Sequence, residues 1–134
     1  MTDTRLAHHD LCFGCGLANV FGLNLEARAT DEGAVSGRFF VKQDHQGPPG
    51  YAHGGIIAAA LDEAMALAAL HARGVHVTAR LEVDFRAPAA VGTFVLVDAS
   101  LAPEGERVWA RATARAEADR GLLAEGRALL AAAG

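Results

Sequence analysis

The sequence predicts an α+β protein in which one long central helix is wrapped by a curved, six-stranded antiparallel sheet. Three observations lead to this prediction. The chain has 134 residues, which is the length of one domain. Only one segment, residues 56–73, has the length and composition of a long helix. Six other segments alternate apolar and polar residues, as strands with one buried face do.

Two of these strands precede the helix. Residues 23–30 and residues 34–41 each place apolar side chains on one face, and the turn at residues 31–33 would join them as a hairpin. Residues 43–50 are rich in Gly and Pro and are expected to form an ordered loop. The helix is apolar on nearly every side and ends before Gly74, so it must be buried on most sides.

Four further strands follow the helix and are predicted to form an antiparallel meander, with Gly- or Pro-containing turns between them. The first of the four alternates so regularly that one of its faces is expected to be dry. The last is rich in Ala and has helix propensity as well. A single curved sheet around the helix would bury every apolar stripe. The four segments are residues 77–86, 93–101, 107–117 and 122–130.

Composition argues against several classes of function. The net charge is −4 and the Lys and Arg residues are scattered, so no basic stripe matches a nucleic-acid backbone. Residues 1–10 are polar where a secretory signal would be apolar, and no uncharged stretch is long enough to span a membrane. We therefore expect a cytoplasmic protein without a nucleic-acid or membrane partner. Residues 1–134 would form a single domain, with residues 1–22 as an N-terminal loop segment.

The N-terminal loop segment contains two cysteines at C-x-x-C spacing, Cys12 and Cys15. A reducing cytosol would keep them as thiols, so no structural disulfide is expected. Together with His8 and His9 they could in principle supply four zinc ligands. Adjacent histidines rarely converge on one ion without a dedicated turn, and we therefore predict no metal site.

Two features of the predicted helix are candidates for chemistry. Gly54 and Gly55 at its start leave amide hydrogens open to a ligand oxygen, although glycines there could equally serve close packing. Asp62 and Glu63 are the only carboxylates between positions 56 and 70, and buried carboxylates are costly unless they are paired or functional. Adjacent side chains point about 100° apart, so only one is expected to be catalytic. Both could instead reach solvent or an Arg at a helix edge.

Three segments resemble a known family: residues 12–16 (CFGCG), 47–55 (GPPGYAHGG) and 78–81 (TARL). Asn19 and Gly22-Leu23 add to the first. With them the sequence resembles the PaaI-like branch of the hotdog-fold thioesterases, which includes the acyl-CoA thioesterases called thioesterase superfamily members. The resemblance implies the hotdog fold and hydrolysis of an acyl-CoA to free acid and CoA. It implies no cofactor other than the CoA of the substrate.

The resemblance also implies roles for individual residues. Asp62, nine positions after His53, would be the nucleophile or general base, and Thr78 would orient the water or the carboxylate. The amides of Gly54 and Gly55 would bind the thioester carbonyl oxygen. His53 would polarise the thioester, orient the loop, or have only a structural role.

One position departs from the family pattern. Many members carry Asn or Gln six positions before the motif histidine, and this chain has Gly47 there. Gln46 or His45 could take over the binding of substrate next to Gly47. For the CoA phosphates, the candidates are Arg80 and Arg86, with Arg107 as a third.

Helix geometry predicts that two copies share the active site. Gly54 and Asp62 lie about 12 Å apart along the helix axis, too far for both to touch one thioester group. In a homodimer with antiparallel helices, the start of each helix would lie beside the middle of the other. We therefore expect a homodimer, or a dimer of dimers, that binds CoA along the interface.

Two alternatives remain at this point. A hotdog dehydratase or hydratase would need a His and an acidic residue at other spacings, and the pair Asp3 and His8 lacks the flanking residues. A non-catalytic acyl-CoA-binding module would have no need of Asp62. The small residues of the helix and the absence of a basic pocket favour an uncharged aryl or medium-chain acyl group.

Overall fold

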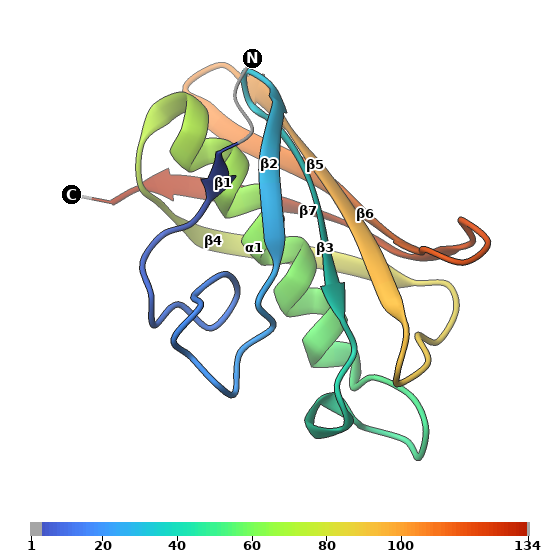
Figure 1. The fold of residues 1–134 in the computed structure, drawn as a ribbon. Coiled ribbons are helices and arrows are strands. Elements are labelled where there is room, and N and C mark those ends of the chain that lie inside the picture. Colours follow the sequence, from blue (N-terminus) through green and yellow to red (C-terminus); the bar gives the residue numbers. More distant parts are fainter. Residues whose placement is uncertain (1–3, 134) are drawn as a thin grey trace.

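The computed structural model describes residues 4–133, apart from the side chains of residues 103 and 104. One long helix lies against one large sheet (Figure 1). The elements in chain order are β1 (Arg5–Leu6), β2 (Glu26–Asp31), β3 (Ala34–Phe40), the short 3-10 helix η1 (Gln43–His45), α1 (Gly54–Arg73), β4 (His76–Phe85), β5 (Phe94–Glu104), β6 (Arg107–Ala116) and β7 (Leu122–Ala132).

The sheet has seven strands in the order β1-β2-β3-β5-β6-β7-β4, and every pairing is antiparallel. All six predicted strands are present, and the two-residue β1 is the additional one. Strands β5, β6 and β7 form a meander, but β4 pairs with β7 at the far edge. The prediction of a four-stranded meander was therefore wrong. The reason is that α1 crosses the sheet between β3 and β4 and carries the chain to the opposite edge.

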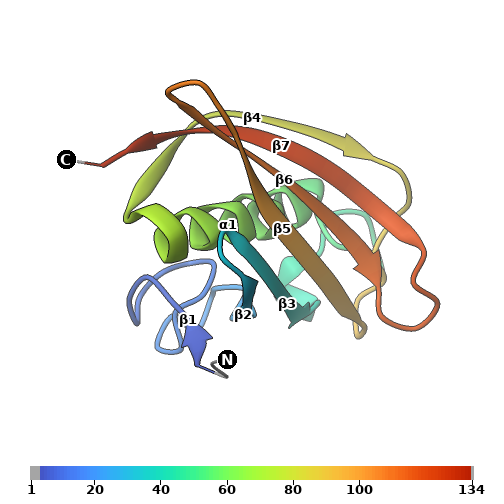
Figure 2. The ribbon, with the colours of Figure 1, turned by 90° about the horizontal axis from the view of Figure 1, so that it is seen from above.

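Helix α1 lies in the concave side of the curved sheet (Figure 2). Leu61, Met65 and Leu67 on the helix are fully buried, as are Val95 and Val97 on β5. Small alanines on the helix and on β6 allow the two to pack closely. By length and composition alone α1 could cross a membrane, but a buried core helix meets the same criterion.

Strand β4 differs from the predicted pattern. A β-bulge shifts its register against β7 between Thr78 and Arg80 and so breaks the alternation of side chains. Apolar side chains remain exposed, with Val77 at 55%, Leu81 at 37% and Phe85 at 54% of their accessible area. The expectation of a dry face on this strand is thus wrong for a single chain.

Candidate active site and the N-terminal cysteine cluster

The loop before α1 is held by backbone hydrogen bonds. The amide of Gly47 donates to the carbonyl of Tyr51 (3.0 Å), and the amide of His53 donates to the carbonyl of His45 (2.8 Å). A Cβ at Gly47 would lie 2.8 Å from the Cα of His53, closer than side chains can pack. Glycine at this position therefore lets the loop lie directly against the start of the helix.

His53 is the N-cap of α1, and its Nδ1 accepts a hydrogen bond from the amide of Gly55 (2.8 Å). The amide of Gly55 is therefore engaged within the loop. The amide of Gly54 donates to no group among residues 4–133, and Gly54 is exposed. The first amides of a helix carry partial positive charge, so Gly54 is the open donor at this helix end.

Asp62 lies eight residues further along α1 and is half-buried. Thr78 on β4 donates a hydrogen bond from Oγ1 to Asp62 Oδ1 at 2.5 Å. The β-bulge after Thr78 turns this hydroxyl toward the helix, whereas Arg80 and Glu82 lie on the outer face. One carboxylate oxygen is thus fixed, and Oδ2 has no partner in the described part of the chain. A carboxylate with one anchored and one open oxygen is suited to act as nucleophile or general base.

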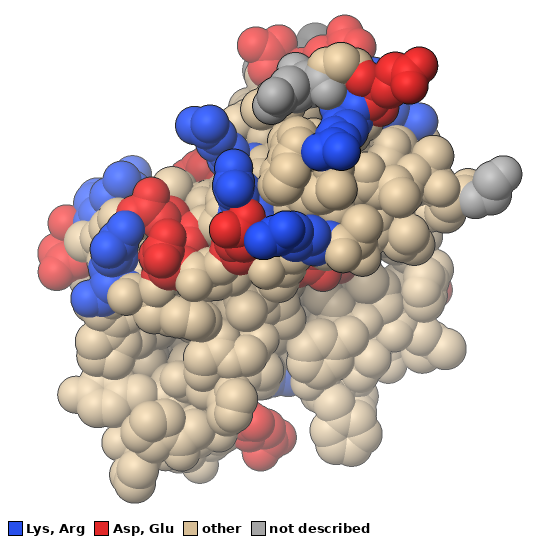
Figure 3. Space-filling model, turned by 180° about the vertical axis from the view of Figure 1, so that it is seen from behind, with Lys and Arg blue, Asp and Glu red and all other residues tan. Residues whose placement is uncertain are grey.

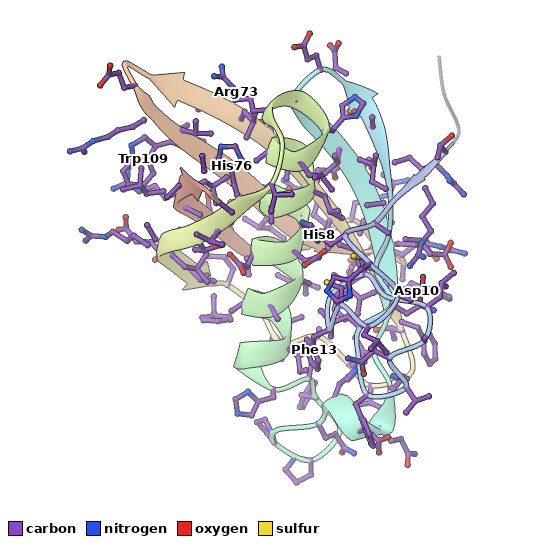
Figure 4. All side chains as sticks on the ribbon, turned by 90° about the vertical axis from the view of Figure 1, so that its left-hand side faces the viewer. His8, Asp10, Phe13, Arg73, His76 and Trp109 are labelled. Atoms are coloured by element: carbon purple, nitrogen blue, oxygen red, sulfur yellow. The ribbon has the colours of Figure 1, made fainter. Side chains whose placement is uncertain are left out.

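Glu63 points to the other side of the helix, into a cluster with the N-terminal loop. Its Oε2 lies 2.8 Å from His8 Nδ1, and both carboxylate oxygens lie 3.6 Å from Cys12 Sγ. The sulfur of Cys15 lies 3.7 Å from His8 Nδ1. His8 is placed directly beside α1 in Figure 4. Of the two adjacent carboxylates, Glu63 is therefore enclosed by this cluster while Asp62 faces the sheet edge.

The cluster shifts the ionisation of its members. Hydrogen bonding to Cys15 and to Glu63 raises the pKa of His8 to about 11. Burial raises the pKa of the Cys15 thiol. Burial opposes ionisation of Glu63, but hydrogen bonds from His8 and Cys15 hold its pKa below the usual value. Glu63 is therefore a carboxylate that the N-terminal loop stabilises in its charged form.

The two residues proposed to replace the missing family amide, His45 and Gln46, both make hydrogen bonds within the loop. His45 is 2% exposed; its Nδ1 accepts from the amide of Lys42 (3.0 Å), and its Nε2 donates to the carbonyl of Gly22 (3.4 Å). Burial lowers its pKa. The hypothesis that His45 contacts substrate was wrong, because its ring is enclosed. Gln46 accepts from the amide of Gly50 (2.7 Å) with Oε1 and is exposed.

Arg80 and Arg86 lie exposed on β4 and pair with carboxylates. Arg80 Nε is 3.8 Å from Glu82, and an Arg86 guanidinium nitrogen is 3.1 Å from Glu125. Figure 3 shows basic and acidic side chains interleaved on this side of the molecule. A hollow of about 270 Å³ on the outer face of the sheet is lined partly by the same carboxylates. Neither arginine contacts Asp62 in the single chain.

The family model described as "Thioesterase superfamily" matches residues 49–110. This range includes the end of the loop before α1, from Pro49 onward, and also Asp62 and Thr78. The chain is therefore similar to this superfamily over somewhat less than half of its length. It is also 35% identical over 85 residues, 63% of its length, to the acyl-coenzyme A thioesterase THEM4 of Xenopus laevis. The chain spans only 38% of the length of that curated relative.

Solved structures of thioesterases have the same fold as this chain. Thioesterase superfamily member 2 of zebrafish superposes with a TM-score of 0.74 at 23% identity, over 84% of this chain and 88% of that one. A hypothetical thioesterase of Streptococcus pneumoniae, solved with coenzyme A, has a TM-score of 0.74 at 14% identity over 80% and 84% of the two chains. The same protein was solved with an Asp and a Thr, sixteen positions apart, each replaced by Ala (TM-score 0.74, 13% identity, 80% and 88% covered).

The sequence alone did not reveal two features of this site. One is the hydrogen bond by which the side chain of His53 caps the start of α1 at the amide of Gly55, which depends on the local backbone turn. The bulge that directs Thr78 to Asp62 depends on the pairing of β4 with β7, which no local residue pattern encodes.

Proposed function

We propose that this protein is an acyl-CoA thioesterase that hydrolyses an uncharged aryl or medium-chain acyl-CoA to the free acid and CoA. The observation that carries the proposal is the Asp62 carboxylate, held on one oxygen by Thr78 and open on the other. Hydrolysis by a carboxylate needs neither a metal nor a redox cofactor. The protein would work in the cytoplasm.

The similar proteins support this activity. The curated relative is named an acyl-coenzyme A thioesterase, and the Streptococcus pneumoniae structure contains coenzyme A. The Asp and Thr that were replaced in that protein are sixteen positions apart, as Asp62 and Thr78 are here. In this chain those two side chains share a hydrogen bond.

The mechanism uses the two open groups of α1. The thioester carbonyl oxygen accepts a hydrogen bond from the Gly54 amide, where the helix end stabilises the developing negative charge. Asp62 either attacks the carbonyl carbon to form an anhydride, which water then cleaves, or takes a proton from an attacking water. The C–S bond breaks and the CoA thiolate leaves. The amide of Gly55 supports this site indirectly, because it fixes the ring of His53.

A homodimer would complete the site. Gly54 and Asp62 of one chain are about 12 Å apart along α1, so the two groups that meet one thioester must come from different chains. Strand β4 pairs with β7 on one side only and exposes Leu81 and Phe85, as an edge that joins a second copy would. Two such dimers would associate further. CoA phosphates would meet Arg80 or Arg86 at the rim of this interface.

The test is a panel of acyl-CoAs incubated with the purified protein and a thiol reagent that reports free CoA. We expect release from aryl and medium-chain substrates by the natural protein and a loss of kcat of about 10²–10⁴-fold in Asp62→Asn. Glu63→Gln, the matched change one residue away, should retain much more activity per folded chain. Tight binding of acyl-CoA without CoA release would show a binding module, and reversible hydration of an enoyl-CoA would show a hydratase.

A further inference from the structure

Glu63 and the three side chains around it are not needed for the proposed hydrolysis, yet together they have the ligand atoms of a metal site. His8 Nδ1, Cys12 Sγ, Cys15 Sγ and a Glu63 oxygen all lie within 4.8 Å of one another. Three of them come from residues 8–15 of the N-terminal loop and one from the middle of α1. A nitrogen, two sulfurs and a carboxylate oxygen are the ligands that zinc takes in proteins.

The spacing of these atoms matches a tetrahedral ion. Zinc bonds of about 2.0–2.3 Å at tetrahedral angles place ligand atoms about 3.3–3.8 Å apart. The sulfurs of Cys12 and Cys15 lie 3.8 Å and 3.7 Å from His8 Nδ1, and Cys12 Sγ lies 3.6 Å from each Glu63 oxygen. His8 and Glu63 are closer together, at 2.8 Å, because they share a hydrogen bond. An ion between them would require them to separate by roughly half an ångström.

The backbone of the loop is shaped to hold this cluster. The amide of His8 donates to Cys15 Sγ (3.2 Å), which is a contact that stabilises negative charge on a sulfur. The amide of Gly16 donates to the carbonyl of Cys12 (2.8 Å) and closes the turn between the cysteines. A Cβ at Gly14 would overlap the Glu63 side chain. Glycine at position 14 therefore allows the carboxylate to reach the cysteines.

We propose that His8, Cys12, Cys15 and Glu63 bind one Zn²⁺ in a closed structural site. Four protein ligands leave no open position for water or substrate, so the ion would have no part in the chemistry. It would fasten the N-terminal loop to α1 at the residue next to Asp62. His9 is not a ligand: it is exposed, and its Nδ1 accepts from the amide of Leu11. The fourth ligand comes from the helix, 55 positions away from His8.

The first experiment measures metal content. The full chain is expressed in zinc-supplemented medium, purified under reducing conditions without chelator, and analysed by mass spectrometry for metals. We expect about one zinc per chain. In protein reloaded with Co²⁺, we expect a thiolate-to-cobalt charge-transfer band and the intense visible bands of a tetrahedral site. Natural protein that is folded but holds less than about a tenth of an equivalent of zinc, and gives no such bands with Co²⁺, would overturn the proposal.

The second experiment identifies the ligands by matched variants. Cys15→Ser and Glu63→Gln should lower zinc content at least tenfold, whereas His9→Asn should keep it. Retention of zinc by Glu63→Gln together with its loss in His9→Asn would refute this ligand set. Should the cysteine variant not fold, a chelator titration of the natural protein decides: removal of the ion should lower its melting temperature, and readdition of Zn²⁺ should restore it. An unchanged melting temperature after complete zinc removal would refute a structural role.

Discussion

Mixing two inactive variants tests the shared active site. Asp62→Asn removes the carboxylate and keeps the helix start intact. Gly54→Leu blocks the open amide and keeps the carboxylate. A Cβ at Gly54 would lie 3.6 Å from the ring of Phe85, in ordinary contact, so the larger side chain covers the helix end without disturbing the core. Each variant alone should be inactive, because every site of its homodimer lacks one of the two groups.

The recovered activity can be calculated from the geometry of a twofold dimer. Random exchange of equal amounts gives about half mixed dimers, and each mixed dimer has one site with both groups intact and one with neither. About a quarter of all sites should therefore work, giving about a quarter of the natural specific activity. Subunit exchange is verified with chains of different mass by native mass spectrometry, and CoA release is measured on the same sample. Verified exchange without any recovery would mean that Gly54 and Asp62 of one chain serve the same thioester.

Three further predictions concern single residues. Thr78→Val removes the hydrogen bond to Asp62 and should lower kcat by roughly 10–100-fold with little change in KM. Thr78→Ser keeps the hydroxyl and should retain most of the natural kcat. An equal loss of kcat in both variants would exclude the hydroxyl as the reason for the loss. Leu81→Glu places a charge on the exposed face of β4 and should shift the protein from dimer toward monomer in sedimentation experiments. An unchanged sedimentation coefficient would argue against β4 as the dimer interface. Burial lowers the pKa of His45, and its ring accepts a hydrogen bond from the amide of Lys42, so the folded protein holds this side chain neutral. Its contribution to the free energy of unfolding is therefore complete above about pH 6.5, and it is lost as the pH falls toward the lowered pKa of the folded state. His45→Gln should therefore make the free energy of unfolding less dependent on pH below about pH 6.5, and an equal dependence on pH in chemical denaturation of the two proteins would refute this.

The sequence predicted the elements well because each has a strong local pattern. The helix of residues 56–73 was found at Gly54–Arg73, and the last strand, despite its alanines, was found at Leu122–Ala132. Sequence pattern does not specify which strands pair. The position of β4 beside β7 follows from the path of α1 across the sheet, which no alternation of residues encodes. The bulge that breaks its alternation escaped prediction for the same reason.

Spacing along one helix predicted the directions of two side chains in the candidate site. Adjacent Asp62 and Glu63 were expected to point about 100° apart, and the structure places them in different surroundings. The choice of Asp62 as the catalytic one rested on the family resemblance and stays a prediction. Contacts between distant segments could not be predicted in this way. The sequence pattern placed His9 among the possible zinc ligands because it is adjacent to His8. No pattern indicated that Glu63 would lie within 3.6 Å of Cys12 Sγ.

The opposite surroundings of Asp62 and Glu63 explain how the helix is held. Two side chains about 100° apart, each fixed by a different segment, determine the rotation of a helix about its own axis, which one contact alone cannot do. Thr78 fixes Asp62 from the sheet edge, and the cluster with His8 fixes Glu63 from the N-terminal loop. A rotation that improved one contact would stretch the other. The N-terminal loop and the sheet edge therefore hold α1 at neighbouring positions, and the hydrogen bond that fixes Asp62 comes from Thr78 without the loop.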